Sequence, residues 1–86
     1  MKITFDVAKR DATLEGRGLD FADAAKVFAG PTLTLRDDRQ DYGQSYGLLD
    51  KRVVMIVWTP RGADRRAISM RHCHEREASK VRQRIR

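Results

Sequence analysis

The most apolar run of the 86-residue chain, Val53–Trp58, constrains the fold more than any other stretch. It is rich in β-branched residues and ends at Thr59-Pro60. A short apolar run of this composition predicts a strand that is buried on both faces. Tyr46–Leu49 and Arg66–Arg71 predict one further strand on each side, joined to the central strand by short turns. We therefore expect a three-stranded antiparallel meander with Val53–Trp58 in the middle.

The third strand of this meander carries arginines on both of its faces. Because side chains alternate across a strand, one face is expected to hold Arg66, Ile68 and Met70, and the other Arg65, Ala67, Ser69 and Arg71. The larger apolar side chains, Ile68 and Met70, are expected in the core. The small side chains of the other face cannot fill a core, so Arg65 and Arg71 are predicted to share an open face.

The segment before the meander predicts a short strand, Lys2–Phe5, followed by a helix over Val7–Glu15. Asp6 is a favourable N-cap for this helix, and the glycines on either side of Arg17 are expected to end it. Arg17 itself is predicted to be an exposed turn residue, with membership of an anion site as the alternative.

A second helix is predicted after Asp20, which with Asp23 resembles a capping box. Helical spacing predicts a face that packs on the sheet, formed by Phe21, Ala24, Ala25 and Phe28. A strand over Thr32–Leu35 and a charged loop over residues 36–43 follow. The carboxylates of the loop match no calcium-loop spacing, so local ion pairs are expected there, with Mg²⁺ or Ca²⁺ binding as the alternative.

The hairpin turn at Asp50-Lys51 lacks the glycine that a two-residue type I′ turn prefers at its second position. Lys51 is therefore expected to adopt a positive φ, unless the turn is longer. After Arg71 the apolar spacing becomes helical, and Ala78, Val81 and Ile85 predict a helix from about Cys73 or His74 onward. This apolar stripe is thin, so the helix is expected to need a partner surface or RNA to hold it.

The basic excess of the chain lies at its C-terminal end. The formal net charge is +6; residues 1–60 hold nine Lys/Arg and nine Asp/Glu, whereas residues 61–86 hold nine Lys/Arg and three Asp/Glu. A basic excess confined to one end of the chain favours a polyanion, most simply nucleic acid, as the binding partner. A solvated basic helix or tail is the alternative.

His72 and Arg71 together predict cleavage of RNA. Imidazole titrates near neutrality and can move a proton, and a guanidinium binds phosphate through two parallel hydrogen bonds. Attack by the ribose 2′-hydroxyl on the phosphate requires proton transfer and stabilisation of a charge-rich phosphorane. It requires no metal. Arg61 and Arg65 are expected to hold flanking phosphates. The alternative for His72 is an ordinary surface histidine.

Other polar and aromatic groups are weaker candidates. Tyr46, Tyr42 and Trp58 are candidates for stacking a base, although core packing is favoured for Trp58. The run His72-Cys73-His74 is not expected to hold zinc, because adjacent side chains on a strand point apart and no other Cys or His is present. Cys73 is expected to be a small buried hydrophobe. We therefore predict no metal and no cofactor.

The chain is expected to be a single domain over residues 1–86. One cysteine allows no disulfide within the chain and fits a reducing compartment. The N-terminus, MKITFDVAKR, has no apolar signal core, and no stretch approaches the roughly 20 apolar residues that span a bilayer. We therefore expect a cytoplasmic protein with no membrane association.

Several collinear segments resemble the BrnT toxins of bacterial type II toxin–antitoxin systems. They are ITFDVAKRDATLEGRGLDFADAAKVF, DDRQDY, GLLDKRVVMIVWTPRG and the ending ISMR-x-x-x-x-RE. The resemblance implies an α+β fold of the RelE-like class, with two N-terminal helices packed on a twisted antiparallel sheet and a basic C-terminal helix. Arg61, Arg71, Arg76 and Glu77 match recurring charged residues of that family. The sequence departs from the family at Gly16-Arg17-Gly18, where Lys-His-Gly is usual, and at His72, where Arg or Lys is usual.

The resemblance further implies a ribonuclease that blocks translation and is neutralised by a BrnA-type antitoxin in a hetero-oligomer. Operator DNA would then be bound indirectly, through the antitoxin. The catalytic residues are expected to be Arg71, His72 and Arg61, and the RNA-binding residues Arg65, Arg66, Arg76, Lys80 and Tyr46. The alternative function is a non-catalytic basic subunit that binds an acidic partner or operator DNA within a repressor complex.

Overall fold

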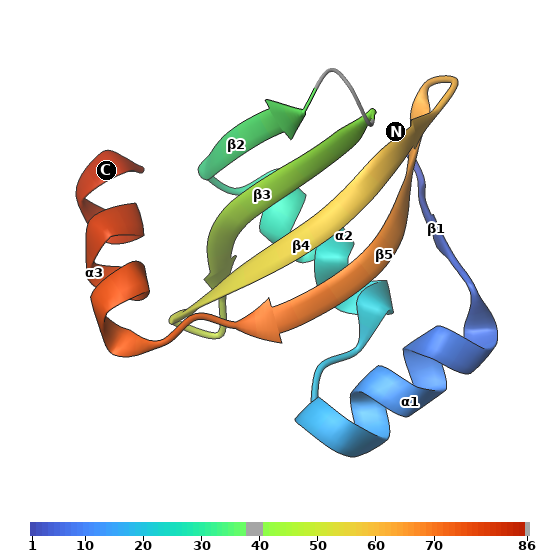
Figure 1. Ribbon diagram of the computed structural model, residues 1–86, viewed down its shortest axis with the longest axis horizontal. Helices are drawn as coiled ribbons and strands as arrows, with labels where there is room; N and C mark the ends of the chain where they lie inside the picture. The colour runs from blue at the N-terminus through green and yellow to red at the C-terminus, as the bar shows by residue number, and fades with distance from the viewer. Residues whose placement is uncertain (38–40, 86) are drawn as a thin grey trace.

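The computed structural model describes residues 1–37 and 41–85 (Figure 1). The chain begins with strand β1 (Ile3–Phe5) and helix α1 (Val7–Arg17), continues through a 3₁₀ turn η1 (Phe21–Asp23) into helix α2 (Ala24–Ala29), and then forms β2 (Thr32–Asp37), β3 (Tyr42–Leu49), β4 (Arg52–Arg61), β5 (Asp64–His72) and α3 (Glu75–Arg84). The strands form one sheet in the order β1-β5-β4-β3-β2.

The predicted meander is confirmed, because β3, β4 and β5 pair antiparallel in sequence order. The prediction of a wholly antiparallel sheet is wrong, because β1 joins the edge of β5 in parallel, from Ile3 beside Arg65 to Phe5 beside Ala67. A parallel neighbour requires a long connection. Here α1, α2 and three strands lie between the two partners, so the sheet is mixed.

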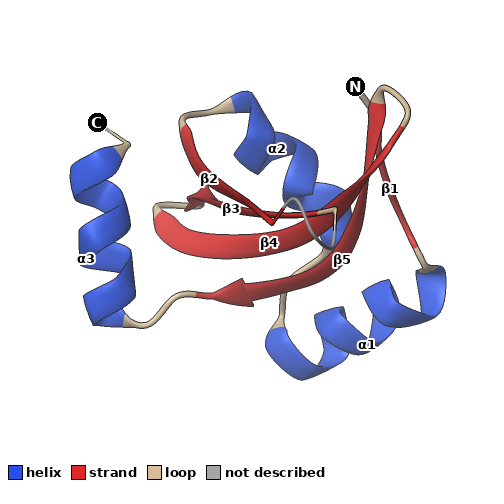
Figure 2. Cartoon of the chain, turned by 45° about the horizontal axis from the view of Figure 1, so that its top comes forward, coloured by secondary structure: helices blue, strands red, loops and turns tan. Residues whose placement is uncertain are grey.

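Strand β4 is buried on both of its faces, as its sequence predicts. Val53 to Ile56 are all buried, and Trp58 is only 2% exposed. Val54, Ile56 and Trp58 face α2, where they form a core with Phe21, Ala24, Val27 and Met70. Val53 instead contacts Ala78 and Val81 of α3. Alternate residues of β4 therefore belong to different clusters, and α2 and α3 lie on opposite faces of the sheet (Figure 2).

Only one of the two N-terminal helices packs on a face of the sheet. Helix α1 has no buried residue and lies along the edge of the sheet next to β5 (Figure 1). Its N-cap is Asp6, whose carboxylate accepts a hydrogen bond from the Lys9 N–H, as predicted. The left-handed residue that ends α1 is Gly18, so Gly16 and Arg17 still belong to the helix.

The second helix begins as predicted but packs through a different residue. The Asp20 carboxylate accepts from the Ala22 N–H at the start of η1 and also binds the Arg10 guanidinium of α1 through two hydrogen bonds of 2.9 Å. This ion pair joins the two helices. Val27 is buried, whereas Ala25, which was expected on the core face, is exposed, because the first turn is 3₁₀ and shifts the faces that follow.

The turn between β3 and β4 has positive φ at both Asp50 (50°) and Lys51 (70°), which confirms the expectation for Lys51. In the charged segment, Arg36 and Asp37 belong to β2, and Arg36 forms a 3.3 Å ion pair with Asp41, as the local ion-pair prediction requires. Asp38, Arg39 and Gln40 lie outside the described residues. None of the helices in the described part of the chain is long and apolar enough to cross a membrane.

We predict that Gly43→Ala destabilises the protein. Gly43 pairs with Trp58 across β3 and β4, and a Cβ atom at this position would overlap the indole ring. Overpacking of this kind costs about 1–3 kcal/mol. Gly16→Ala is the matched control, because a Cβ atom there meets nothing within 4 Å and Gly16 lies inside α1, where alanine is favoured by about 0.5–1 kcal/mol.

Urea unfolding of the two variants measures both effects. A Gly43→Ala protein as stable as wild type would contradict the packing of Trp58 against the backbone of β3.

Candidate functional site

An ion pair between β5 and α3 lies at the centre of the basic C-terminal region. Arg71 Nη1 donates to Glu77 Oε1 at 2.8 Å, and Arg71 Nη2 donates to Glu77 Oε2 at 3.0 Å. The side chains are 36% and 23% exposed, so solvent and ligands still reach the guanidinium. The planar fork of guanidinium donors that binds a carboxylate in this bidentate geometry can bind two oxygens of a phosphate in the same way.

The start of α3 positions Glu77. His74 is the N-cap, and its Nδ1 accepts a 3.4 Å hydrogen bond from the Glu77 N–H. Glu75 and Glu77 lie in the first helical turn, where negative charge is favoured by the helix dipole. Ala78 and Val81 then anchor the helix on Val53, so the predicted thin apolar stripe packs on the sheet. Arg82 Nη2 adds a 2.9 Å hydrogen bond to the Lys51 carbonyl.

The face of the sheet beneath α3 carries one row of side chains across four strands. Leu33 pairs with Tyr46, Tyr46 with Met55, and Met55 with Arg71. Residues paired in this way share a face. Tyr46 and Arg71 therefore approach Glu77 from the same side of the sheet.

The pKa values of this cluster follow from its geometry. Hydrogen bonds from Arg71, with a further one from the Cys73 thiol, lower the pKa of Glu77 from 4.5 to about 2. The bond to Glu77 raises the pKa of Arg71. Burial, together with the charge of Glu77, raises the pKa of Tyr46. Burial and the hydrogen bond to Glu77 raise the pKa of Cys73 to about 11, so the thiol stays protonated at neutral pH and is a poor nucleophile.

A cavity of about 270 Å³ lies between α3 and the strands β2 and β3. Its lining combines apolar side chains with charged groups at the helix: Leu33, Leu35, Tyr46, Glu77, Lys80, Val81 and Arg84. Of the predicted site residues, the structure thus brings Arg71, Tyr46 and Lys80 together around Glu77. Arg76 is exposed on α3. Glu77 was not predicted to belong to the site. The RE motif that matches the family was the signal that could have identified it.

The expectation that Arg65 and Arg71 share an open face is wrong. Val57 pairs with Ser69 but Trp58 pairs with Ala67, so Ile68 is the extra residue of a β-bulge. The bulge reverses the alternation between these two arginines. Arg65 lies on the α2 side, with its guanidinium carbon 3.9 Å from the Trp58 ring centre and 4.8 Å from that of Phe28.

The same bulge changes the surroundings of other residues in β5. Burial, with the nearby charge of Arg36, lowers the pKa of Arg65. Met70 is fully buried as expected, but Ile68 is only partly buried, so its predicted core position is wrong. Arg66 pairs with Thr59 and lies on the same face as Ser69 and Arg71.

Two predicted catalytic residues lie away from Arg71. His72 is adjacent to Arg71 in β5, pairs with Val54 and therefore faces the opposite side of the sheet. Its Nδ1 is buried without a hydrogen-bond partner among the described residues, and burial and the charge of Arg52 lower its pKa. Arg61 lies at the β4–β5 turn, where it donates to Thr59 Oγ1 and the Pro60 carbonyl. At ~3.3 Å per residue, β5 separates this turn from Arg71 by roughly 20 Å. The structure does not bring Arg71, His72 and Arg61 together.

Within the described residues, no group of three or more His, Cys, Asp or Glu side chains is arranged to hold a metal ion. His74 serves as a helix cap, and Cys73 contacts Glu77.

The fold, one mixed five-stranded sheet with helices on both faces, places the chain among small α+β proteins. The crystal structure of the Brucella abortus ribonuclease toxin BrnT superposes with a TM-score of 0.76 at 27% sequence identity, covering 87% of this chain and 99% of that one. The family model described as "Ribonuclease toxin, BrnT, of type II toxin-antitoxin system" matches residues 5–77. No match was found among curated proteins.

The chain therefore belongs to the BrnT family of ribonuclease toxins of type II toxin–antitoxin systems. Membership of such a system implies an antitoxin as partner. The family match ends at residue 77 and so includes both Arg71 and Glu77.

We predict that Glu77→Gln removes a pH-dependent part of the stability. The folded pKa of Glu77, about 2, lies below its ordinary value of 4.5, so the ion pair stabilises the fold above about pH 4.5 and is lost as the pH falls toward 2. Charged hydrogen bonds of this kind contribute about 1.5–3 kcal/mol. The difference in unfolding free energy between wild type and Glu77→Gln should therefore be constant near neutrality and shrink between pH 4.5 and pH 2.

Glu75→Gln is the matched control, because Glu75 is exposed in the same first turn of α3. It should reproduce the helix-dipole part of the effect alone. Equal losses for the two variants at pH 7 would contradict a stabilising Arg71–Glu77 pair.

Proposed function

We propose that the chain cleaves single-stranded RNA by attack of the ribose 2′-hydroxyl on the adjacent phosphate, without a metal ion, at the face that carries Arg71 and Glu77. The observation that supports this most is the bidentate pairing of a partly exposed guanidinium with a single carboxylate. It provides a phosphate ligand and a proton acceptor at one point on the sheet. As part of this proposal we assign the fold to the RelE-like class.

In this mechanism the guanidinium of Arg71 releases the Glu77 carboxylate and binds the scissile phosphate. The guanidinium then stabilises the negative charge that develops on the phosphorane oxygens. Once Glu77 loses its partner, the pKa of Glu77 rises from about 2 and its carboxylate becomes a stronger base. Glu77 takes the proton of the 2′-hydroxyl, the 2′-oxygen bonds to phosphorus, and the bond from phosphorus to the 5′-oxygen breaks. The departing 5′-oxygen takes a proton from water, and the hydroxide so formed takes the proton held by Glu77. The products are a 2′,3′-cyclic phosphate and a 5′-hydroxyl.

The remaining residues of this face bind the RNA strand. Arg66 lies on the same side of β5 as Arg71, and Arg76 and Lys80 extend the positive charge along α3. Tyr46 lines the cavity beside Glu77 and offers a ring on which a base can stack. Arg65, which contacts Trp58, is assigned a structural role, and His72 and Arg61 are left out of the site.

In the cell, cleavage of messenger RNA would inhibit translation in the cytoplasm. We propose that the antitoxin partner is of the BrnA type and forms a hetero-oligomer with this chain. The net charge of +6 favours an acidic surface on that partner. Operator DNA would be bound through the antitoxin.

One observation favours a second candidate function. The guanidinium of Arg71 is already paired with a carboxylate of its own chain, as in a purely structural ion pair. The second candidate is a non-catalytic basic subunit that binds an acidic partner or operator DNA in a repressor complex. It predicts that the purified chain, free of antitoxin, leaves RNA intact.

We predict that Arg71→Gln lowers the rate of RNA cleavage by about 10²–10³-fold, the usual effect of removing one oxyanion ligand. Glutamine keeps much of the side-chain volume but cannot bind phosphate with a charged fork. Lys26→Ala is the charge-matched control, because Lys26 lies on α2 and pairs with Asp23. Circular dichroism checks that both variants are folded. An Arg71→Gln protein that cleaves at the wild-type rate would show that the site is elsewhere.

We also predict that cleavage continues at an unchanged rate in EDTA and that products end in 2′,3′-cyclic phosphate. Mass spectrometry of the fragments from a defined RNA identifies the ends. A substrate with a 2′-O-methyl group at the scissile position should not be cut, because it lacks the nucleophile. Cleavage of that substrate, or products with a 3′-hydroxyl, would rule out attack by the ribose.

A further inference from the structure

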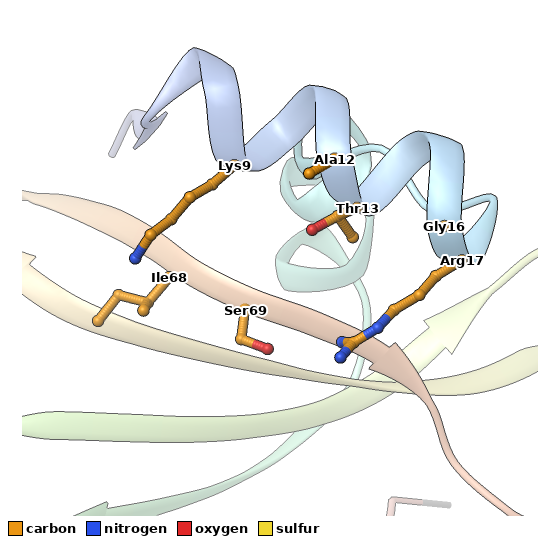
Figure 3. Close-up of a pocket in the computed structure, with 7 residues that line it drawn as sticks. All are labelled: Lys9, Ala12, Thr13, Gly16, Arg17, Ile68 and Ser69. Atoms are coloured by element: carbon orange, nitrogen blue, oxygen red, sulfur yellow. The ribbon is translucent and has the colours of Figure 1, made fainter.

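A second pocket lies between α1 and the outer edge of β5, apart from the cavity beneath α3. Its volume is about 380 Å³, within the range of about 300–1,000 Å³ that is usual for ligand pockets. The helix contributes Lys9, Thr13 and Arg17, and the strand contributes Ile68 and Ser69 (Figure 3). No carboxylate is among the described residues that line it.

The pocket forms where strand pairing along the outer edge of β5 ends. Strand β1 covers β5 only as far as Ala67, and the bulge residue Ile68 comes next. From Ile68 onward, the outer edge of β5 faces α1 in place of a strand. Arg17 Nη1 donates to the Met70 carbonyl at 2.9 Å and so fixes the end of α1 against this edge.

The pocket holds two cations that the protein leaves largely unneutralised. Figure 3 shows the side chains of Lys9 and Arg17 both extending from α1 toward β5, on either side of Thr13 and Ser69. Lys9 Nζ forms no hydrogen bond or ion pair with any described residue. Arg17 uses one of its donors on Met70 and keeps the others free among the described residues. The hydroxyls of Thr13 and Ser69 add donors suited to an anion.

The position of Lys9 is unfavourable for the helix itself. Lys9 lies in the first turn of α1, which has no acidic residue, and a cation there opposes the helix dipole. The side chain of Lys9 is exposed, and α1 has no buried residue against which it could pack. The charge of Lys9 therefore adds little to the stability of α1 and is available to a ligand.

We propose that this pocket binds one phosphate of the single-stranded RNA substrate, adjacent to the phosphate at Arg71; the inference rests on the proposed function. Ser69 and Arg71 are two residues apart on the same face of β5, which is about 7 Å along the strand. Lys9 and Arg17 are eight residues apart on α1, about 12 Å, so a phosphate lies between them. The RNA strand then runs along β5, from Arg66 past this pocket to Arg71.

Binding of an uncleavable RNA tests the inference. A labelled oligonucleotide with 2′-O-methyl groups throughout is titrated with wild-type protein and with Lys9→Ala, Lys9→Arg and Lys26→Ala at several salt concentrations. Loss of one phosphate contact reduces the slope of log K against log salt by about 0.7 for a single strand. Lys9→Ala should weaken binding several-fold and reduce the slope by this amount, Lys9→Arg should restore both, and Lys26→Ala should change neither. Thermal midpoints confirm that each variant is folded.

The results separate this inference from the proposed function. If Lys9→Ala binds with wild-type affinity and slope while Arg71→Gln abolishes cleavage, the pocket is not a phosphate site and the catalytic assignment stands. If Lys9→Ala weakens binding while Arg71→Gln still cleaves, the pocket binds RNA and the catalytic assignment fails. Wild-type protein that does not bind the oligonucleotide overturns the inference, whatever its activity on ordinary RNA.

Discussion

The β-bulge at Ile68 is the constraint on which the functional arrangement depends. It inserts one residue between the pairs Trp58–Ala67 and Val57–Ser69, and so decides which arginines of β5 face α2 and which face α3. Without it, Arg65 and Arg71 would lie on one face. With it, Arg65 fills the space between Phe28 and Trp58, and Arg71 is free to meet Glu77. Bulges are over-represented next to active sites, where they redirect a side chain.

The ion pair on the α3 face connects stability with the proposed chemistry. In the free protein, Arg71 and Glu77 satisfy each other and join β5 to α3. Among the described residues, the apolar side chains that α3 contributes to the cluster around Val53 are Ala78, Val81 and the partly buried Ile85. An RNA phosphate competes for the same guanidinium, and its binding would release the carboxylate. The same two side chains thus hold the helix in the resting protein and supply the phosphate ligand and the base during the reaction.

Local patterns predicted most of the elements, whereas contacts distant in sequence decided the site. The apolar run of β4, the Asp6 cap and the positive φ of Lys51 all follow from a few neighbouring residues. The parallel pairing of β1 with β5 depends on segments about 60 residues apart, and nothing in Ala67-Ile68-Ser69 indicates a bulge. The predicted pair of Arg71 and His72 failed for a reason that was available in the sequence. Alternation, which separates His72 from Cys73, also separates His72 from Arg71.

The pKa of Glu77 in the free protein and in the RNA complex tests the central claim most directly. Carbon-13 NMR of the side-chain carboxyl follows its titration in the presence and absence of the 2′-O-methyl oligonucleotide. In the free protein the pKa should be about 2, because Arg71 holds the carboxylate. In the complex it should rise toward or above its ordinary value, because the phosphate has taken the guanidinium and adds a negative charge nearby. A pKa that stays low with RNA bound would show that Arg71 and Glu77 remain paired, and would contradict the mechanism.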